Sequence, residues 1–124
     1  MKLIDPEVLR MFREKTTCEF CGRPCPDGCD PHHFWRKRGM GGGSRIDHPL
    51  NLISLCRGYY RGKWVSCHDD AEAGRITKYD LLALVARREG VLQDEIITAL
   101  EGIRRLSKWA SPEEVEALIP KRAG

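Results

Sequence analysis

Six cysteines constrain the fold of this chain more than any other feature of its sequence. They are Cys18, Cys21, Cys25, Cys29, Cys56 and Cys67. The chain has only 124 residues, of which 7% are aromatic, so we expect a modest hydrophobic core that needs an additional cross-link. An even number of cysteines is compatible with three disulfides in a secreted protein. The N-terminal residues lack the apolar segment of a secretory signal, which favours a reducing compartment with free or metal-bound thiols.

The first two cysteines have the spacing of a zinc knuckle. Two residues separate Cys18 from Cys21, so both thiolates can reach one tetrahedral ion, and Gly22 tolerates the tight turn that follows. One pair of this kind needs a second pair of ligands from elsewhere in the chain. A thiol redox centre is the weaker interpretation, because no thioredoxin-like βαβ pattern follows the pair.

Basic residues are concentrated in one segment, although the whole chain carries a net charge of only +3. Residues 32–64 contain one acidic residue, Asp47, and seven basic ones, so this segment carries +6 and the remainder −3. The basic residues are Arg36, Lys37, Arg38, Arg45, Arg57, Arg61 and Lys63. Aromatic residues and glycines lie among them. This mixture favours contact with a nucleic-acid backbone over an ordinary solvated surface loop.

The hydrophobic pattern predicts an α+β fold in which a small mixed region precedes several helices. We expect helices at residues 5–15, 66–73, 77–89, 92–108 and 111–119. Extended segments are expected at 31–35 and 50–55, whereas two basic insertions, 36–49 and 57–65, are expected to form loops. The predicted organisation is an N-terminal helix at 1–17, a core at 18–76 and a helical extension at 77–124. The longest apolar runs are too short to span a membrane.

The histidines follow a pattern typical of a metal site beside a reacting group. His32 and His33 are adjacent in an expected extended segment, so their side chains point to opposite sides. One can then bind a metal while the other faces a substrate. His68 and Glu72 are four residues apart in a predicted helix, where they share one face as two ligands of an ion must. Without a metal, these residues would be ordinary surface side chains.

Taken together and in this order, these motifs resemble the HNH endonucleases. The matching parts are Cys18-x-x-Cys21-Gly22, His32-His33, the glycine-rich basic loop, Asn51-Leu52-Ile53-Ser54-Leu55-Cys56 and Cys67-His68. They extend over residues 18–74, about half of the chain, and the preceding helix is similar to that of small phage and prophage members. The resemblance implies a ββα-metal motif stabilised by a four-cysteine zinc site.

The resemblance also implies a role for each polar residue of the motif. His33 corresponds to the general base that activates water, and Asn51 to the asparagine that holds the active-site geometry. His32 and His68 correspond to ligands of the catalytic metal. The family has a further histidine at the place of Glu72, whose carboxylate would instead give a harder site that suits Mg²⁺ or Mn²⁺.

For the structural zinc, the resemblance implies the ligands Cys18, Cys21, Cys56 and Cys67. Ten residues separate the last two, where the family usually has a much shorter spacing, so this insertion is expected to bulge out as a loop. Cys25 or Cys29 could substitute as ligands, and otherwise both are spare thiols. His48 could contact the DNA or the metal, and otherwise it is a surface group of the basic loop.

We therefore expect a metal-dependent DNA endonuclease that takes Zn²⁺ structurally and Mg²⁺, Mn²⁺ or Ni²⁺ catalytically. The seven basic residues named above are the expected DNA contacts, through phosphates rather than through base sequence. A zinc-stabilised DNA-binding module that has lost catalysis is the alternative, which Glu72 keeps open. A cytoplasmic location without membrane contact is expected. The resemblance leaves cleavage specificity, strand preference and biological setting open, with phage packaging or recombination proteins among the partners to consider.

Overall fold

The structure is a computed structural model that describes residues 4–35, 45–107 and 109–121. In these residues the chain forms an α+β fold with helices and two small antiparallel sheets, as the sequence predicts. The helices are α1 (Pro6–Arg13), α2 (Cys67–Glu72), α3 (Lys78–Glu89), α4 (Gln93–Arg105) and α5 (Pro112–Glu116), with a 3₁₀ turn, η1, at Pro49–Asn51. The strands are β1 (Asp30–His33), β2 (Leu52–Leu55), β3 (Arg57–Tyr60) and β4 (Lys63–Ser66).

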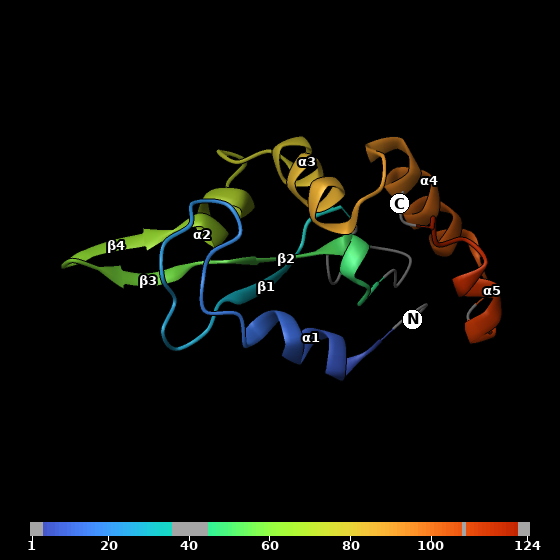
Figure 1. Ribbon diagram of the computed structural model, residues 1–124, viewed down its shortest axis with the longest axis horizontal. Coiled ribbons are helices and arrows are strands. Elements are labelled where there is room, and N and C mark those ends of the chain that lie inside the picture. Colours follow the sequence, from blue (N-terminus) through green and yellow to red (C-terminus); the bar gives the residue numbers. More distant parts are fainter. Residues whose placement is uncertain (1–3, 36–44, 108, 122–124) are drawn as a thin grey trace.

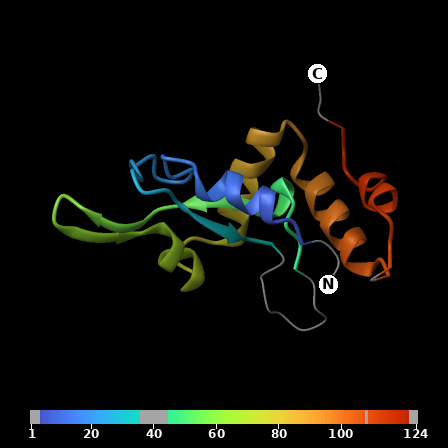
Figure 2. The same ribbon diagram turned by 90° about the horizontal axis from the view of Figure 1, so that it is seen from below.

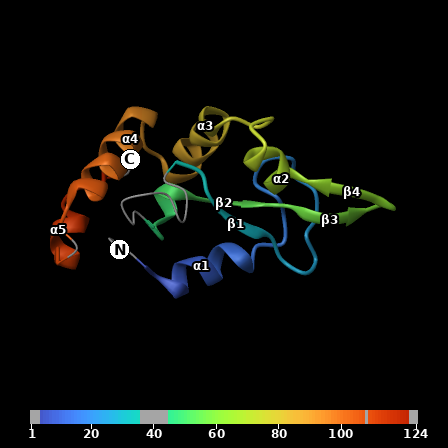
Figure 3. The same ribbon diagram turned by 180° about the vertical axis from the view of Figure 1, so that it is seen from behind.

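The sheet of β1 and β2 lies at the centre of the molecule, between helices (Figure 1). The two strands pair antiparallel, with His32 opposite Ile53 and His33 opposite Leu52. Helix α1 lies on one side of this sheet and α2 and α3 on the other, and the view from behind shows the same order (Figure 3). Because helices cover both faces, every residue of β2 is buried, which explains its mostly apolar sequence.

Helix α1 begins where its sequence predicts. Asp5 caps it, because its side chain accepts hydrogen bonds from the backbone N–H groups of Glu7 and Val8. The buried residues of the helix, Leu9 and Phe12, pack against β2. The helix therefore covers the face of the central sheet that α2 and α3 leave open.

The insertion at 57–65 is a β-hairpin, and the prediction that it forms a loop was wrong. Strands β3 and β4 pair antiparallel through a two-residue turn at Arg61 and Gly62, whose φ angles are 51° and 79°. Two positive φ values are what a tight hairpin turn requires, and glycine adopts them at little cost. The basic composition hid the alternation of side chains along the two strands. The hairpin extends away from the rest of the molecule (Figure 2).

The helices from α3 onward share one hydrophobic core with the central sheet. Leu81 and Val85 of α3 and Leu100 and Ile103 of α4 belong to the same buried cluster as Ile53 of β2. Thr77 caps α3 and Gly90 ends it in a left-handed conformation, as predicted, whereas α4 and α5 are shorter than their sequences suggest. The predicted extension thus packs directly on the core. None of the helices in the described ranges is long and apolar enough to cross a bilayer.

Arg88 of α3 joins the extension to the cysteine-rich loop. Its guanidinium group donates to the carboxylate of Glu19 at 2.9 Å and to the carbonyl oxygen of Leu52 at 3.0 Å. Glu19 in turn accepts a hydrogen bond from the backbone N–H of Ser54 at 2.6 Å. Burial raises the pKa of Glu19, but this hydrogen bond and the charge of Arg88 outweigh it, so the pKa lies below its ordinary value. One ion pair therefore fixes the loop against β2 and α3.

Candidate metal centres

Four cysteines from three parts of the chain meet in one cluster. Cys18 and Cys21 come from the loop after α1, Cys56 follows β2, and Cys67 begins α2. Their sulfur atoms all lie within 4.8 Å of one another, and the Sγ atoms of Cys21 and Cys56 are 3.7 Å apart. Sulfurs bound tetrahedrally at about 2.3 Å from zinc would be roughly 3.8 Å apart. The cluster is therefore compatible with a metal site such as zinc.

Burial and mutual repulsion make four thiolates unfavourable here without a cation. Burial raises the pKa of the Cys56 thiol to about 11 and also raises the pKa of Cys67. At Cys21, the most exposed member, hydrogen bonds from the backbone of Arg23 and from the other thiols outweigh burial, so the pKa lies below its ordinary value. A divalent cation would supply the missing positive charge, and its binding would release the thiol protons.

Cys25 and Cys29, the spare thiols of the sequence prediction, lie outside this cluster. Both are buried in the hydrophobic core, and burial raises the pKa of Cys29. Their segment approaches the end of α1 so closely that a side chain at Gly28 would lie 2.4 Å from the carbonyl oxygen of Arg13. Glycine is therefore required at that position, and the two thiols act as packing residues.

A second cluster joins the central sheet to helix α2. Nδ1 of His32, on β1, lies 3.4 Å from Oε1 of Glu72, and Nε2 of His68 lies 3.5 Å from the same oxygen. Two ligands held tetrahedrally at about 2.1 Å from one ion would be roughly 3.4 Å apart. The side chain of His32 is only 4% exposed, whereas that of Glu72 is 53% exposed. The three residues predicted as metal ligands thus lie together, with one side open to solvent.

Asp30 orients one of these histidines. Its Oδ2 lies 2.9 Å from Nδ1 of His68, and since a carboxylate can only accept, Nδ1 carries the proton. The lone pair of the neutral ring then lies on Nε2, the nitrogen that faces Glu72. Carboxylate partners of this kind fix the ring orientation of metal-binding histidines. Asp30 is therefore a positioning residue for the second cluster.

His33 is held by a buried carboxylate. Its Nε2 lies 2.7 Å from Oδ1 of Asp47. The same oxygen accepts from Arg45, and Oδ2 of Asp47 accepts from the backbone N–H of Asp5. Burial raises the pKa of Asp47, but the hydrogen bonds from Arg45, His33 and Asp5 outweigh it, so the pKa lies below its ordinary value. Nε2 of His33 therefore donates, and the lone pair of the neutral ring lies on Nδ1.

Asn51 ties the end of β1 to the start of β2. The residue is fully buried, its side-chain amide donates to the carbonyl oxygen of Ile46 at 3.0 Å, and its Oδ1 accepts from the backbone N–H of Trp35 at 3.2 Å. These two bonds join Trp35, just after the histidine pair, to Ile46, just before the 3₁₀ turn. Asn51 therefore has a positioning role in the structure.

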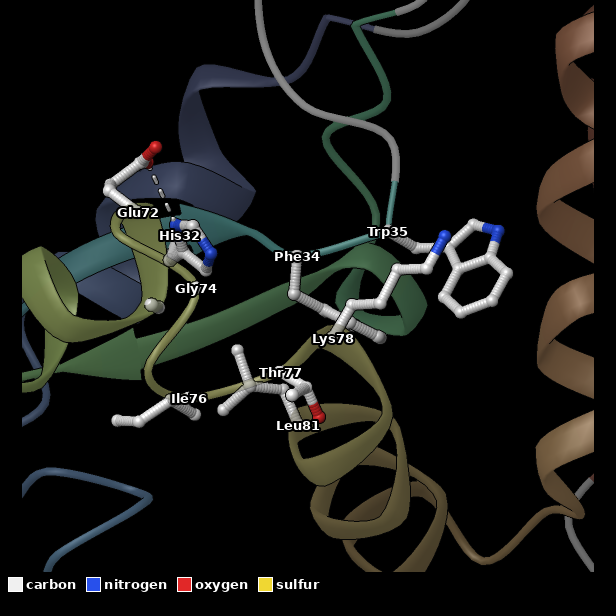
Figure 4. A pocket seen from close by; sticks show the side chains of 10 residues that line it. His32, Phe34, Trp35, Glu72, Gly74, Ile76, Thr77, Lys78 and Leu81 are labelled. Carbon is white, nitrogen blue, oxygen red and sulfur yellow. Dashed lines mark ion pairs between the residues drawn. The ribbon is translucent and has the colours of Figure 1, made fainter.

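Two cavities border the second cluster, and both are lined by His32 and Glu72. One, of about 280 Å³, is lined by Leu9 and Arg13 of α1 together with His33 and the cluster. The other, of about 400 Å³, extends from His32 and Glu72 toward α3. Figure 4 shows Glu72 and His32 at one end of this second cavity and Lys78 beside Trp35 at the other, where the Lys78 ammonium lies 4.3 Å from the ring centre.

No protein-family model, curated protein sequence or solved structure matches this chain. The two clusters are therefore interpreted from their own geometry.

The predicted DNA contacts fall into three groups. Arg36, Lys37 and Arg38 lie outside the described residues. Arg45 pairs with Asp47 at 3.0 Å and is only 13% exposed, so its charge is balanced within the protein. The remaining three, Arg57, Arg61 and Lys63, are exposed on the hairpin. The hairpin therefore carries the predicted contacts that the structure leaves accessible.

His48 lies outside both clusters. Its Nδ1 accepts a hydrogen bond from the backbone N–H of Leu50 at 3.1 Å and so caps the 3₁₀ turn η1. Burial lowers the pKa of His48 in spite of nearby acidic groups, which keeps the ring neutral and able to accept. The residue is half-buried and has a local structural role.

Sequence reasoning missed the two carboxylates that orient the histidines. Asp30 is two residues before His32 in a strand, so both side chains lie on one face of the sheet, and this spacing could have revealed it. Asp47 is fourteen residues from His33 and lies within the predicted basic loop at 36–49. No local pattern connects that pair, because their contact depends on the path of the chain between β1 and η1.

Proposed function

We propose that this chain is a metal-dependent DNA endonuclease of the HNH type, in which β1, β2 and α2 form the ββα-metal motif. The observation that carries the proposal is the convergence of His32 from β1 with His68 and Glu72 from α2 at an open cluster. A divalent ion there, Mg²⁺, Mn²⁺ or Ni²⁺, would stabilise the negative charge that develops on a phosphodiester during hydrolysis. The mixed nitrogen and oxygen ligands fit such an ion.

His33 is the proposed general base. A neutral imidazole can take a proton from water near neutral pH. The hydrogen bond to Asp47 leaves the lone pair on Nδ1. The negative charge of Asp47 also stabilises the imidazolium that forms once His33 has taken a proton. His33 also lines the same cavity as the proposed metal ligands, which agrees with a reacting water near both.

Basic side chains border both cavities and are suited to phosphates on either side of the scissile bond. Arg13 of α1 lines the smaller cavity, and Lys78 of α3 lines the larger one. Their charges would hold the backbone of the substrate without reading its sequence. The four-cysteine cluster would hold a structural Zn²⁺ that ties α2 to the loop after α1.

Cleavage of a supercoiled plasmid tests the proposal. We expect nicking when Mg²⁺, Mn²⁺ or Ni²⁺ is added and none without added metal. Glu72→Ala should abolish most of the activity, whereas Glu72→His should retain it and shift the preference toward Ni²⁺. Asp70→Ala is the matched control, because this carboxylate lies on the same helix and pairs with Arg75 at 2.9 Å instead. Equal activity of Glu72→Ala and the parent would contradict the assignment of this ligand.

A zinc-stabilised DNA-binding module without catalysis is the second candidate. Two observations favour it: Glu72 replaces the last histidine of the HNH pattern, and His33 is only 8% exposed and already bonded to Asp47. If the parent fails to nick the plasmid with every metal and still binds it, this candidate replaces the first. Cleavage by Glu72→His alone would show that the chain is a silenced nuclease.

A further inference from the structure

The hairpin of β3 and β4 has one supported face and one open face. On the supported face, Tyr60 lies 5.9 Å from the guanidinium of Arg23, which belongs to the cysteine-rich loop, and Val65 is half-buried. On the open face, Tyr59 and Trp64 are opposite each other across the strands, with exposed fractions of 78% and 51%. Large aromatic side chains this exposed on an extended hairpin mark a binding surface.

The two open rings are held in place although they face solvent. They pack edge to face, with ring centres 5.3 Å apart. The indole N–H of Trp64 donates to Oδ2 of Asp69 on α2 at 3.3 Å, and the same carboxylate binds Arg57. Because its one polar atom is already used, Trp64 offers a partner its ring and no hydrogen bond. The surface is therefore suited to stacking rather than to reading polar edges.

The charge of the hairpin selects an anionic partner. Residues 57–66 contain three basic residues and no aspartate or glutamate; Asp69 balances the charge of Arg57, and Arg61 and Lys63 carry the rest. Arg23 adds a further positive charge beside the supported face. Aromatic rings interleaved with basic side chains are the combination that binds single-stranded nucleic acid, since bases stack on the rings while the cations follow the phosphates. In a duplex the faces of the bases are stacked on one another, so the two aromatic rings would contribute little binding energy.

We propose that Tyr59 and Trp64 form a stacking platform for unpaired bases of DNA. The inference rests on the proposed function only in taking DNA as the nucleic acid. Since Asp69, which orients the platform, is next to the proposed ligand His68 on α2, bases on the platform lie at the end of the helix that carries the cluster. The substrate class is then DNA with a single-stranded segment, such as a branch or an open duplex.

Binding without cleavage tests this proposal. A labelled oligothymidylate of about 20 nucleotides and a duplex of the same length are titrated with the full chain and no added divalent metal. We expect Tyr59→Ala and Trp64→Ala each to weaken binding of the single strand by about tenfold and to affect the duplex much less. Trp109→Ala is the matched control, because Trp109 is 82% exposed and lies far along the chain from the hairpin.

Fluorescence of Trp64 itself gives a second measurement that leaves the hairpin intact. In a chain with Trp35→Phe and Trp109→Phe, Trp64 is the remaining tryptophan, and stacking of a base should quench its emission. Normal single-strand binding by both alanine variants, or emission that the oligonucleotide leaves unchanged, would overturn the proposal and point to a protein partner. Equal losses on single strand and duplex would also overturn it, because they would indicate phosphate contact alone.

The outcomes separate this inference from the proposed function. If the parent nicks plasmid and the hairpin variants bind the oligonucleotide normally, the nuclease proposal stands and the stacking platform is wrong. If the chain binds the oligonucleotide through the hairpin but fails to cut DNA with any of the metals, the stacking platform stands and the nuclease proposal is wrong. As a control, the zinc content of each variant is measured, and it should equal that of the parent if the hairpin substitutions leave the adjacent cysteine cluster intact.

Discussion

The four-cysteine cluster is largely buried and surrounded by protein, whereas the cluster of His32, His68 and Glu72 borders two cavities and has an exposed carboxylate. The first consists of four soft sulfur ligands, which favour zinc and leave no coordination position for a substrate. The second mixes nitrogen and oxygen from three side chains, so a bound ion would keep open positions. Both clusters draw on α2, which begins at one ligand, Cys67, and places His68 in the other.

The two clusters therefore differ in their expected roles: the cysteine cluster stabilises the fold, and the open cluster is suited to chemistry. A closed cysteine site contributes to folding stability, because the ion binds the folded chain far better than the unfolded one. An open site loses and regains its ion without unfolding the protein. We therefore expect substitutions in the first cluster to change stability, and substitutions in the second to change metal affinity and rate.

Cys18→Ser should have the largest effect. Structural zinc in small domains is bound with roughly 10–16 kcal/mol, as much as the whole stability of a domain this size. The variant should lose zinc and its cooperative thermal transition, measured by elemental analysis and circular dichroism. Cys25→Ser, outside the cluster, should keep one zinc per chain and lose only about 1 kcal/mol. A folded Cys18→Ser chain without metal would mean that the cluster does not hold the fold.

His33→Ala should slow plasmid cleavage by about two to four orders of magnitude, the usual contribution of a general base. Its affinity for Mn²⁺, measured by calorimetry, should stay close to that of the parent, because His33 is not among the clustered ligands. His48→Ala is the matched control, since its ring only caps η1. A parallel loss of metal affinity in His33→Ala would place this residue among the ligands instead.

Asp30→Ala should lower the affinity of the His32, His68 and Glu72 cluster for its metal by about 10–100-fold. This is the usual effect of removing the carboxylate that binds a histidine ligand. Zinc content should not change, which distinguishes the open cluster from the closed one. Asp27→Ala, three residues earlier and exposed, is the control. If the two variants bind Mn²⁺ equally well, the bond between Asp30 and His68 does not orient a ligand.

Arg88→Ala should have the smallest effect and should act on stability alone. The variant leaves the half-buried carboxylate of Glu19 with Lys15 as its remaining cationic partner, which costs about 1 kcal/mol after allowance for partial exposure. Urea denaturation measures the loss, and the exposed neighbour Arg87→Ala should show almost none. A variant of normal stability but reduced cleavage would show that α3 positions the open cluster directly.

The sequence was sufficient to predict features that depend on local spacing. The cap at Asp5, the buried strand before Cys56, the helix that carries His68 and Glu72, and the cap at Thr77 all follow from patterns a few residues long. The association of two cysteine pairs was predicted because the resemblance supplied the second pair. These elements place most of the residues of both clusters.

The rest depends on contacts between distant residues. The hairpin was expected to be a loop, because its basic side chains conceal an alternation that becomes visible only once Cys56 and Cys67 fix its two ends. The pairing of Asp47 with His33 and of Arg88 with Glu19 joins residues far apart in the chain. Buried polar groups find such partners through the fold, and a single sequence gives little sign of which partner each will have.

Counting metal and activity on the same sample tests the central claim, that one cluster is closed and the other exchanges its ion. The purified chain is dialysed against a weak chelator, and zinc, thermal stability and plasmid cleavage are measured before and after Mg²⁺ or Mn²⁺ is added. We predict one zinc per chain and an unchanged melting temperature throughout, with cleavage absent after dialysis and restored by the added metal. A folded chain that has lost its zinc, or cleavage that continues without added metal, would contradict the account.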